Sequence, residues 1–304
     1  MHCELVIPGL LASGARPASL ELLIARGRRG RSEPQRLEQW LQDAFGLEGR
    51  LAAGALSLLG AGVAPGDATW IRADPVHMQV MRDRVLLAPA SGFVIAPEDA
   101  DALCAAVNRH FAGTIELRAL DASRWCARLA GELEVGDEPP REMAGREATQ
   151  RAGDALLTEI QMLLHAHPVN EAREARGEPA VNSLWLWGSG RLPGKAQSRW
   201  QSVSSEDPLA LGLARLAGIA AHSSPADASA WLSRAPEDGR HLVILESAVE
   251  ALERDWFAPL AAALRGGQIG MLSLHVPDAG LSFETIRGDL RRFWRRPKAL
   301  ASYA

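Results

Sequence analysis

The stretch Leu242-Val243-Ile244-Leu245 decides the fold class, because such an apolar run is typical of a strand buried on both faces of a parallel sheet. Two further runs resemble it, Ser183-Leu184-Trp185-Leu186-Trp187 and Gly270-Met271-Leu272-Ser273-Leu274. Helices are expected between these strands at 208–219 and 225–234, each opened by an N-cap residue and a proline. This alternation predicts an α/β domain with a mostly parallel sheet between helices.

The rest of the chain divides around this domain. Residues 4–7 read as another buried strand, so the first sixty residues are expected to join the same sheet. Between Gly62 and Gly136 the pattern changes to short strands and one amphipathic helix, which predicts a small α+β unit with an antiparallel sheet. The expected strands are 69–71, 84–87, 114–117 and 125–127, and the expected helices are 36–44, 97–111 and 154–165. We therefore expect a core of residues 1–61 and 150–304, with 62–149 as an inserted α+β domain.

Composition excludes several classes of protein. The 304 residues include 33 Lys and Arg and 37 Asp and Glu. The chain therefore lacks the basic surplus of a dedicated nucleic-acid-binding protein. Three scattered cysteines argue against a disulfide scaffold and a zinc ribbon. No apolar stretch reaches the ~20 residues that span a bilayer, and the N-terminal segment lacks the basic start of a signal peptide. We expect a cytoplasmic protein that binds neither nucleic acid nor membrane. Its oligomeric state is left open by the sequence.

The glycine-rich segment 187–195 follows an apolar strand and could hold a phosphate. A phosphate loop of the Walker type needs Gly at 189 and Ser or Thr at 196, where the chain has Ser189 and Ala196. A dinucleotide-binding loop needs Gly at 193 and meets Pro193. An ordinary turn after the strand is therefore favoured, with anion binding by backbone amides as the alternative.

Three polar clusters have both a functional and a structural interpretation. His165 and His167 lie two apart at a helix end, so they cannot face one metal while helical, and the polar loop 170–182 follows them. Residues 72–77 combine Arg, Asp and His, either as a ligand-facing edge or as an Asp-Pro turn with an ion pair. Residues 291–296 place arginines around two aromatics, as in a nucleic-acid or acidic-partner patch, but a C-terminal helix with both aromatics packed inward is favoured.

Several segments resemble known families. Residues 60–72, Asp83-Arg84 and the helix at Pro97 are similar to the start of the inserted domain in archaeal-type cofactor-independent phosphoglycerate mutases. A second motif of that family resembles His167-Pro168-Val169-Asn170, Arg173, Gly177, Pro179, Asn182, Gly188, Gly190 and Pro193. The whole chain is also similar to the RpfE-type regulatory protein family, through residues 7–11, 37–41, 73–77, 159–165, 185–188, 255–260 and 291–294.

The mutase resemblance implies an alkaline-phosphatase-like fold of three layers, two divalent metals with Asp and His ligands, and a phosphoryl-carrying serine. Several of these residues are absent here. Pro8-Gly9 stands where the family has an Asp-Gly metal ligand, and Arg36-Leu37-Glu38 stands where the nucleophilic serine should begin a helix. The late Gly-Asp-His-Ser motif is replaced by 274–280, and no His follows an Asp by four residues in the C-terminal half.

These absences predict a phosphoglycerate-mutase-like protein with a degenerate metal and nucleophile site, with no cofactor, acting as a non-catalytic regulator or anion sensor. Its partner would be a small anionic metabolite or a protein. The expected ligand pocket consists of Arg72, Asp74, His77, His167, Asn170, Arg173 and Asn182. The alternative is an active metal-dependent phosphomutase or phosphatase with rearranged ligands, drawn from His275, Asp278, Glu246 and Asp255.

Overall fold

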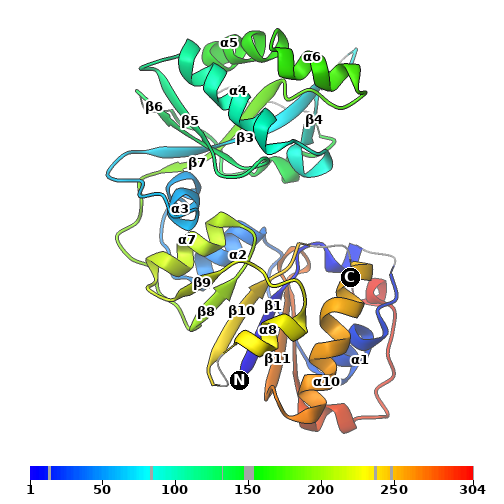
Figure 1. Ribbon diagram of the computed structural model, residues 1–304. Helices are drawn as coiled ribbons and strands as arrows, with labels where there is room; N and C mark the ends of the chain where they lie inside the picture. The colour runs from blue at the N-terminus through cyan, green and yellow to red at the C-terminus, as the bar shows by residue number, and fades with distance from the viewer. Residues whose placement is uncertain are drawn as a thin grey trace. The chain divides into compact units, whose positions relative to one another are not determined.

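The computed structural model describes residues 1–12, 15–82, 85–131, 133–146, 154–235, 238–246 and 249–303 (Figure 1). The chain divides into two compact units. Unit 1 consists of Met1–Leu47 and Lys195–Ala304, and unit 2 is the single segment Glu48–Gly194. Asp83-Arg84 of the family resemblance and residues 147–150 around an expected domain boundary lie outside the described residues.

Unit 1 is built on a seven-stranded sheet with the order β2-β12-β11-β1-β10-β8-β9. Strand β1 pairs in parallel with both β10 and β11, and the parallel pairing continues from β10 through β8 to β9. At the other edge, β12 pairs antiparallel with β11, and β2 pairs antiparallel with β12. The sheet is therefore mostly parallel, as expected. Its strands are β1 (His2–Val6), β2 (Arg28–Arg31), β8 (Ser202–Ser204), β9 (Ala220–His222), β10 (Arg240–Ile244), β11 (Met271–Val276) and β12 (Leu281–Ile286).

Helices cover both faces of this sheet (Figure 1). One face carries Leu5 and Val243, which pack against residues of α1, α8 and α10 in a buried apolar cluster. On the other face lie α2 and α7, and Trp40 of α2 contacts His275 of β11. The helix bounds are α1 (Ala18–Arg26), α2 (Leu37–Ala44), α7 (Pro208–Leu216), α8 (Ala228–Arg234), α9 (Val249–Leu252) and α10 (Ala258–Gly266).

Unit 2 is an antiparallel sheet with helices on both faces. The long strand β3 pairs with β7 along one edge and with β4 and β6 along the other, and β5 extends the sheet beyond β6. Helices α4 and α5 contribute to the apolar cluster on one face, while α3 packs against the opposite face. The elements are α3 (Ala53–Gly60), β3 (Trp70–Val80), β4 (Val85–Pro89), α4 (Pro97–His110), β5 (Ile115–Ala119), β6 (Trp125–Leu129), α5 (Asp154–His165), α6 (Pro168–Ala175) and β7 (Ser183–Gly190).

Small residues let α3 approach this sheet closely. A Cβ on Gly54 would lie 2.6 Å from the backbone nitrogen of Ile71 in β3. Gly188 of β7 has a φ of +59°, and a Cβ there would lie 2.5 Å from the Cβ of Ala53. Gly188 and Gly190 therefore serve strand conformation and helix packing within β7, whereas a turn after the strand was expected there.

Two expectations about domain organisation are wrong. The run at Ser183 was expected in the parallel sheet, but β7 pairs antiparallel with β3, and α3 and α5 bury it on both faces. An apolar run shows that a strand is buried and leaves its partner undetermined. Because β7 and the helices before it pack in unit 2, that unit spans 48–194, whereas 62–149 was expected.

Smaller differences follow from local signals. Helix α8 begins after Asp227, whose carboxylate accepts from the Ala230 amide, and the expected start was Pro225. The expected loop after His167 contains α6, because His167 caps a new helix with proline at its first position. Phe293 and Trp294 do not pack inward: they are 78% and 67% exposed.

The three cysteines are free and buried, and burial raises the pKa of the Cys126 thiol to about 12. No helix in the described ranges is both long enough and apolar enough to span a membrane.

Candidate functional site

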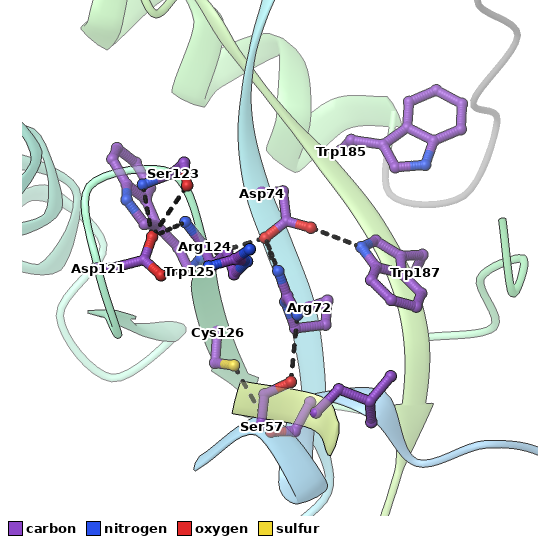
Figure 2. Close-up of polar contacts among 12 residues, drawn as sticks. Ser57, Arg72, Asp74, Asp121, Ser123, Arg124, Trp125, Cys126, Trp185 and Trp187 are labelled. Atoms are coloured by element: carbon purple, nitrogen blue, oxygen red, sulfur yellow. Dashed lines mark hydrogen bonds and ion pairs between the residues drawn. The ribbon is translucent and has the colours of Figure 1, made fainter. Parts of the chain in front are cut away.

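Arg72 and Asp74 form a buried ion pair on β3 (Figure 2). They are two residues apart on the strand, so both side chains point to the face covered by α3. Arg72 donates from Nε and Nη2 to Asp74 Oδ1, at 3.1 and 2.6 Å, and from Nη1 to the Ser57 hydroxyl of α3 at 3.1 Å. Their side chains are only 5% and 4% exposed.

The second oxygen of Asp74 accepts from the Trp187 indole at 2.7 Å (Figure 2). The first oxygen of Asp74, Oδ1, also accepts from the backbone amide of Trp125 at 3.1 Å. The Arg72 guanidinium lies 5.2 Å from the Trp187 ring centre. The ion pair thereby connects α3, β3, β6 and β7. The oxygens of Asp74 and the donors of Arg72 make these contacts within the fold, which supports the ion-pair interpretation of residues 72–77.

His77 and Asn182 hold the segment before β7 against β3. The His77 Nδ1 lies 2.8 Å from the Ala180 carbonyl oxygen. The Asn182 amide accepts from the Met78 N–H at 2.7 Å and donates to the Met78 carbonyl at 2.9 Å. Asn182 therefore extends the strand pairing with its side chain.

Asn170 fixes the turn between α6 and β7. Its amide donates to the carbonyls of Leu164 and Val181, at 2.8 and 2.9 Å, and accepts from the Val181 N–H at 2.8 Å. His167 is the N-cap of α6, and its Nδ1 accepts from the Val169 N–H at 3.2 Å. Both residues serve the local fold.

Arg173 is buried, with 1% of its surface exposed, and its side chain links several segments of unit 2. It donates to the Pro179 and Val94 carbonyls at 3.0 and 2.7 Å and pairs with Asp99 at 3.2 Å. The structure thus places all seven expected pocket residues in unit 2 but in three groups: the Arg72–Asp74 pair, the His77 and Asn182 contacts along β3, and the contacts around α6. Among these seven residues, Arg72 and Asp74 are joined by their side chains, and the backbone amide of Asn170 donates to the His167 carbonyl at 2.9 Å.

A second charged cluster surrounds Glu4 in unit 1, at the first residue of the strand predicted over residues 4–7. Glu4 is fully buried in the central strand β1. Its carboxylate contacts Arg199 at 3.0 Å, Arg240 at 2.7 Å and His275 Nε2 at 3.4 Å. The signal that could have found it is a glutamate between apolar neighbours in a buried strand, because such a charge needs partners.

The electrostatics of this cluster favour a charged Glu4. Burial alone would raise the pKa of Glu4, but His275, Arg199, His2 and Arg240 together hold it well below its usual range. The pKa of the neighbouring His2 is lowered, chiefly by burial. Glu4 is therefore a carboxylate at neutral pH, held by side chains from three other segments.

The carboxyl end of β1 is where the mutase resemblance places a metal ligand. There Pro8 offers no side-chain donor, and the Gly9 amide donates to Asp278 Oδ1 at 2.9 Å. His275 contacts Glu4, and Asp255 pairs with Arg254 at 2.6 Å. Within the described ranges, no three His, Cys, Asp or Glu side chains are gathered so that they could hold a metal ion.

Comparisons with known proteins give a fold. No protein-family profile matches the sequence, and no curated protein matches it. Among solved structures, the chain is similar to the PH0037 protein from Pyrococcus horikoshii, with a TM-score of 0.58 and 14% identity over 99% of this chain and 91% of that one. The chain shares that fold.

The chain is also similar to a cofactor-independent phosphoglycerate mutase from Thermoplasma acidophilum DSM 1728. That match has a TM-score of 0.47 and 17% identity, and it covers 100% of this chain and 94% of that one.

Proposed function

We propose that this protein is a phosphoglycerate-mutase-like chain that has lost phosphoryl-transfer chemistry and acts as a regulator or anion sensor. In this proposal unit 1 corresponds to the alkaline-phosphatase-like core and unit 2 to the inserted domain. The resemblance of the sequence motifs supports the relationship, and the RpfE-type resemblance supports a regulatory role. A cytoplasmic location is part of the same proposal.

One observation carries the loss of chemistry. Just after the central strand β1, Pro8-Gly9 stands in place of the expected metal ligand, and the Asp278 carboxylate accepts a hydrogen bond from the Gly9 backbone. A two-metal phosphoryl-transfer site needs several anionic and imidazole ligands around one point. The described residues do not gather such a set of ligands and so do not fit a pair of metals.

The test is metal binding by the full chain. Protein purified without chelators, then dialysed against Mn²⁺, is expected to hold far less than one tightly bound metal ion per chain by inductively coupled plasma mass spectrometry. Two tightly bound ions per chain would contradict the proposal and favour the alternative, an active enzyme with rearranged ligands. In that case His275→Ala should remove metal, whereas His110→Ala, at an exposed histidine in the last turn of α4, serves as the matched control.

The anion-sensing role does not rest on the seven expected residues of unit 2. The polar atoms of Arg72, Asp74, Asn170 and Arg173 make contacts within the fold, as described above. That pocket stays a prediction. Unit 1 contains a cavity beside β8 and β9, and exposed residues form part of its lining.

A further inference from the structure

A cavity of about 140 Å³ lies beside strands β8 and β9 in unit 1. Its wall includes Ser202, Ser204, His222, Ser223, Trp231 and Arg234. We propose that this cavity binds a small phosphate-type anion, either inorganic phosphate or the phosphate of a small monoester. The proposal gives a location to the anion sensing proposed above, and it rests on that function only for its biological meaning.

The cavity occupies a favourable place in the fold. Ser204 and His222 are the last residues of the parallel strands β8 and β9, and they lie opposite each other in the pairing. Ligands of open α/β sheets bind outside the carboxyl ends of the parallel strands. A cavity of this size has room for several water molecules or one small polar molecule.

The lining offers hydrogen-bond donors and one permanent positive charge. The hydroxyls of Ser204 and Ser223 can each donate one hydrogen bond, and the imidazole of His222 can donate another. Arg234, in the exposed last turn of α8, adds a guanidinium whose planar donors match phosphate oxygens. No carboxylate lines the described wall of this cavity, so its electrostatics favour an anion.

Ser202 gives the site a further preference. Its hydroxyl lies 2.8 Å from Nδ1 of the fully buried His241, while His241 Nε2 lies 3.1 Å from the Asp238 carbonyl oxygen. A carbonyl oxygen only accepts, so Nε2 carries a proton, and in the neutral imidazole Nδ1 accepts from the Ser202 hydroxyl. The remaining lone pairs of the Ser202 hydroxyl oxygen can then accept a hydrogen bond from a protonated oxygen of a ligand.

Monohydrogen phosphate carries such a proton, whereas sulfate at neutral pH does not. The arrangement therefore predicts that the cavity prefers phosphate over sulfate, although both anions have tetrahedral oxygens. A higher affinity for phosphate than for sulfate would distinguish a specific binding site from nonspecific attraction of anions to an arginine.

The experiment is calorimetric titration of the full chain with sodium phosphate, sodium sulfate and glycerol 3-phosphate at constant ionic strength. Phosphate is expected to bind more tightly than sulfate. Arg234→Ala should weaken phosphate binding by roughly tenfold to a hundredfold, the usual effect of losing a charged hydrogen-bond donor. Arg265→Ala is the matched control, because Arg265 is likewise an exposed arginine in the last turn of a helix of unit 1, α10. Tighter binding of glycerol 3-phosphate would identify a monoester as the preferred form.

Ser202→Ala tests the role of Ser202 as a hydrogen-bond acceptor separately. It should bring the affinities for phosphate and sulfate together, and thermal unfolding of the variant shows whether the chain is still folded. Failure of the wild-type chain to bind phosphate, or equal binding by the Arg234→Ala variant, would overturn this proposal. Neither result bears on metal binding, so the proposed loss of phosphoryl transfer would stand or fall on its own test.

Discussion

Replacement of Asp74 by leucine is expected to lower the free energy of unfolding by about 3–5 kcal/mol, the usual cost of removing one member of a buried ion pair. The variant leaves the Arg72 guanidinium buried without its carboxylate, at a position where the side chain is 5% exposed. It also leaves the Trp187 indole N–H and the Trp125 amide without their acceptor. Urea unfolding followed by tryptophan fluorescence measures the loss.

Two variants make the result specific to the buried charge. Asp255→Asn removes one member of the exposed Arg254–Asp255 pair and should leave the urea midpoint unchanged. The double variant Arg72→Met with Asp74→Leu removes both buried charges, and it should recover much of the stability lost in the single variant. A wild-type midpoint for Asp74→Leu would show that the pair does not hold α3, β3 and β7 together. In that case the pair would again be free to serve a ligand.

Replacement of Glu4 by glutamine is expected to lower the free energy of unfolding of unit 1 by about 3 kcal/mol at neutral pH, because Arg199 and Arg240 would lose their shared carboxylate. Both arginine side chains are about half exposed, at 46% and 44%, so water partly compensates the loss. The effect should therefore be smaller than that of Asp74→Leu. The same urea experiment, followed by circular dichroism, measures it.

The Glu4 contribution should depend on pH in one direction. Its pKa is lower in the folded chain than the ordinary value of 4.5, so the unfolded chain takes up the proton first as the pH falls. The stability difference between wild type and Glu4→Gln should be constant near neutral pH and shrink as the pH falls below about 4.5, the ordinary pKa. A difference that grows as the pH falls below about 4.5 would contradict a charged, cation-held Glu4.

Much of the α/β architecture was predictable from apolar runs. The runs at β1, β10 and β11 are strands of the mostly parallel sheet, and the expected helix Asp154–His165 has those bounds in the structure. Asp207 followed by Pro208 marks the start of α7 as expected, with the Asp207 carboxylate accepting from the Leu209 amide. Such signals are local, so one sequence suffices to read them.

Features that depend on distant partners were not predictable. Strands β8 and β9 have three residues each, and Ser202-Val203-Ser204 has no apolar run, so only pairing with β10 reveals the strand β8. The partner of β7 is likewise set by tertiary packing. The arginine-rich stretch 28–31 has the composition of a solvated surface segment, yet it forms the edge strand β2 through pairing with β12.

The candidate site shows the same division. Arg72 and Asp74 were predicted to act together, and their spacing on one strand brings them into contact. Asn170 and Arg173 were selected for their polar type within a family motif, but a buried polar residue can equally hold a turn, as both do here. The cavity beside β8 and β9 was not predictable, because its lining includes residues of two strands and a helix that meet only in the folded unit.

The most direct test of the central proposal is turnover of phosphoglycerate by the full chain with Mn²⁺ or Mg²⁺, followed by nuclear magnetic resonance of phosphorus. A catalytic cofactor-independent mutase serves as the positive control under the same conditions. The account predicts no interconversion of 2-phosphoglycerate and 3-phosphoglycerate above the protein-free rate with either metal. Metal-dependent interconversion that His275→Ala abolishes would contradict it and establish an active enzyme with rearranged ligands.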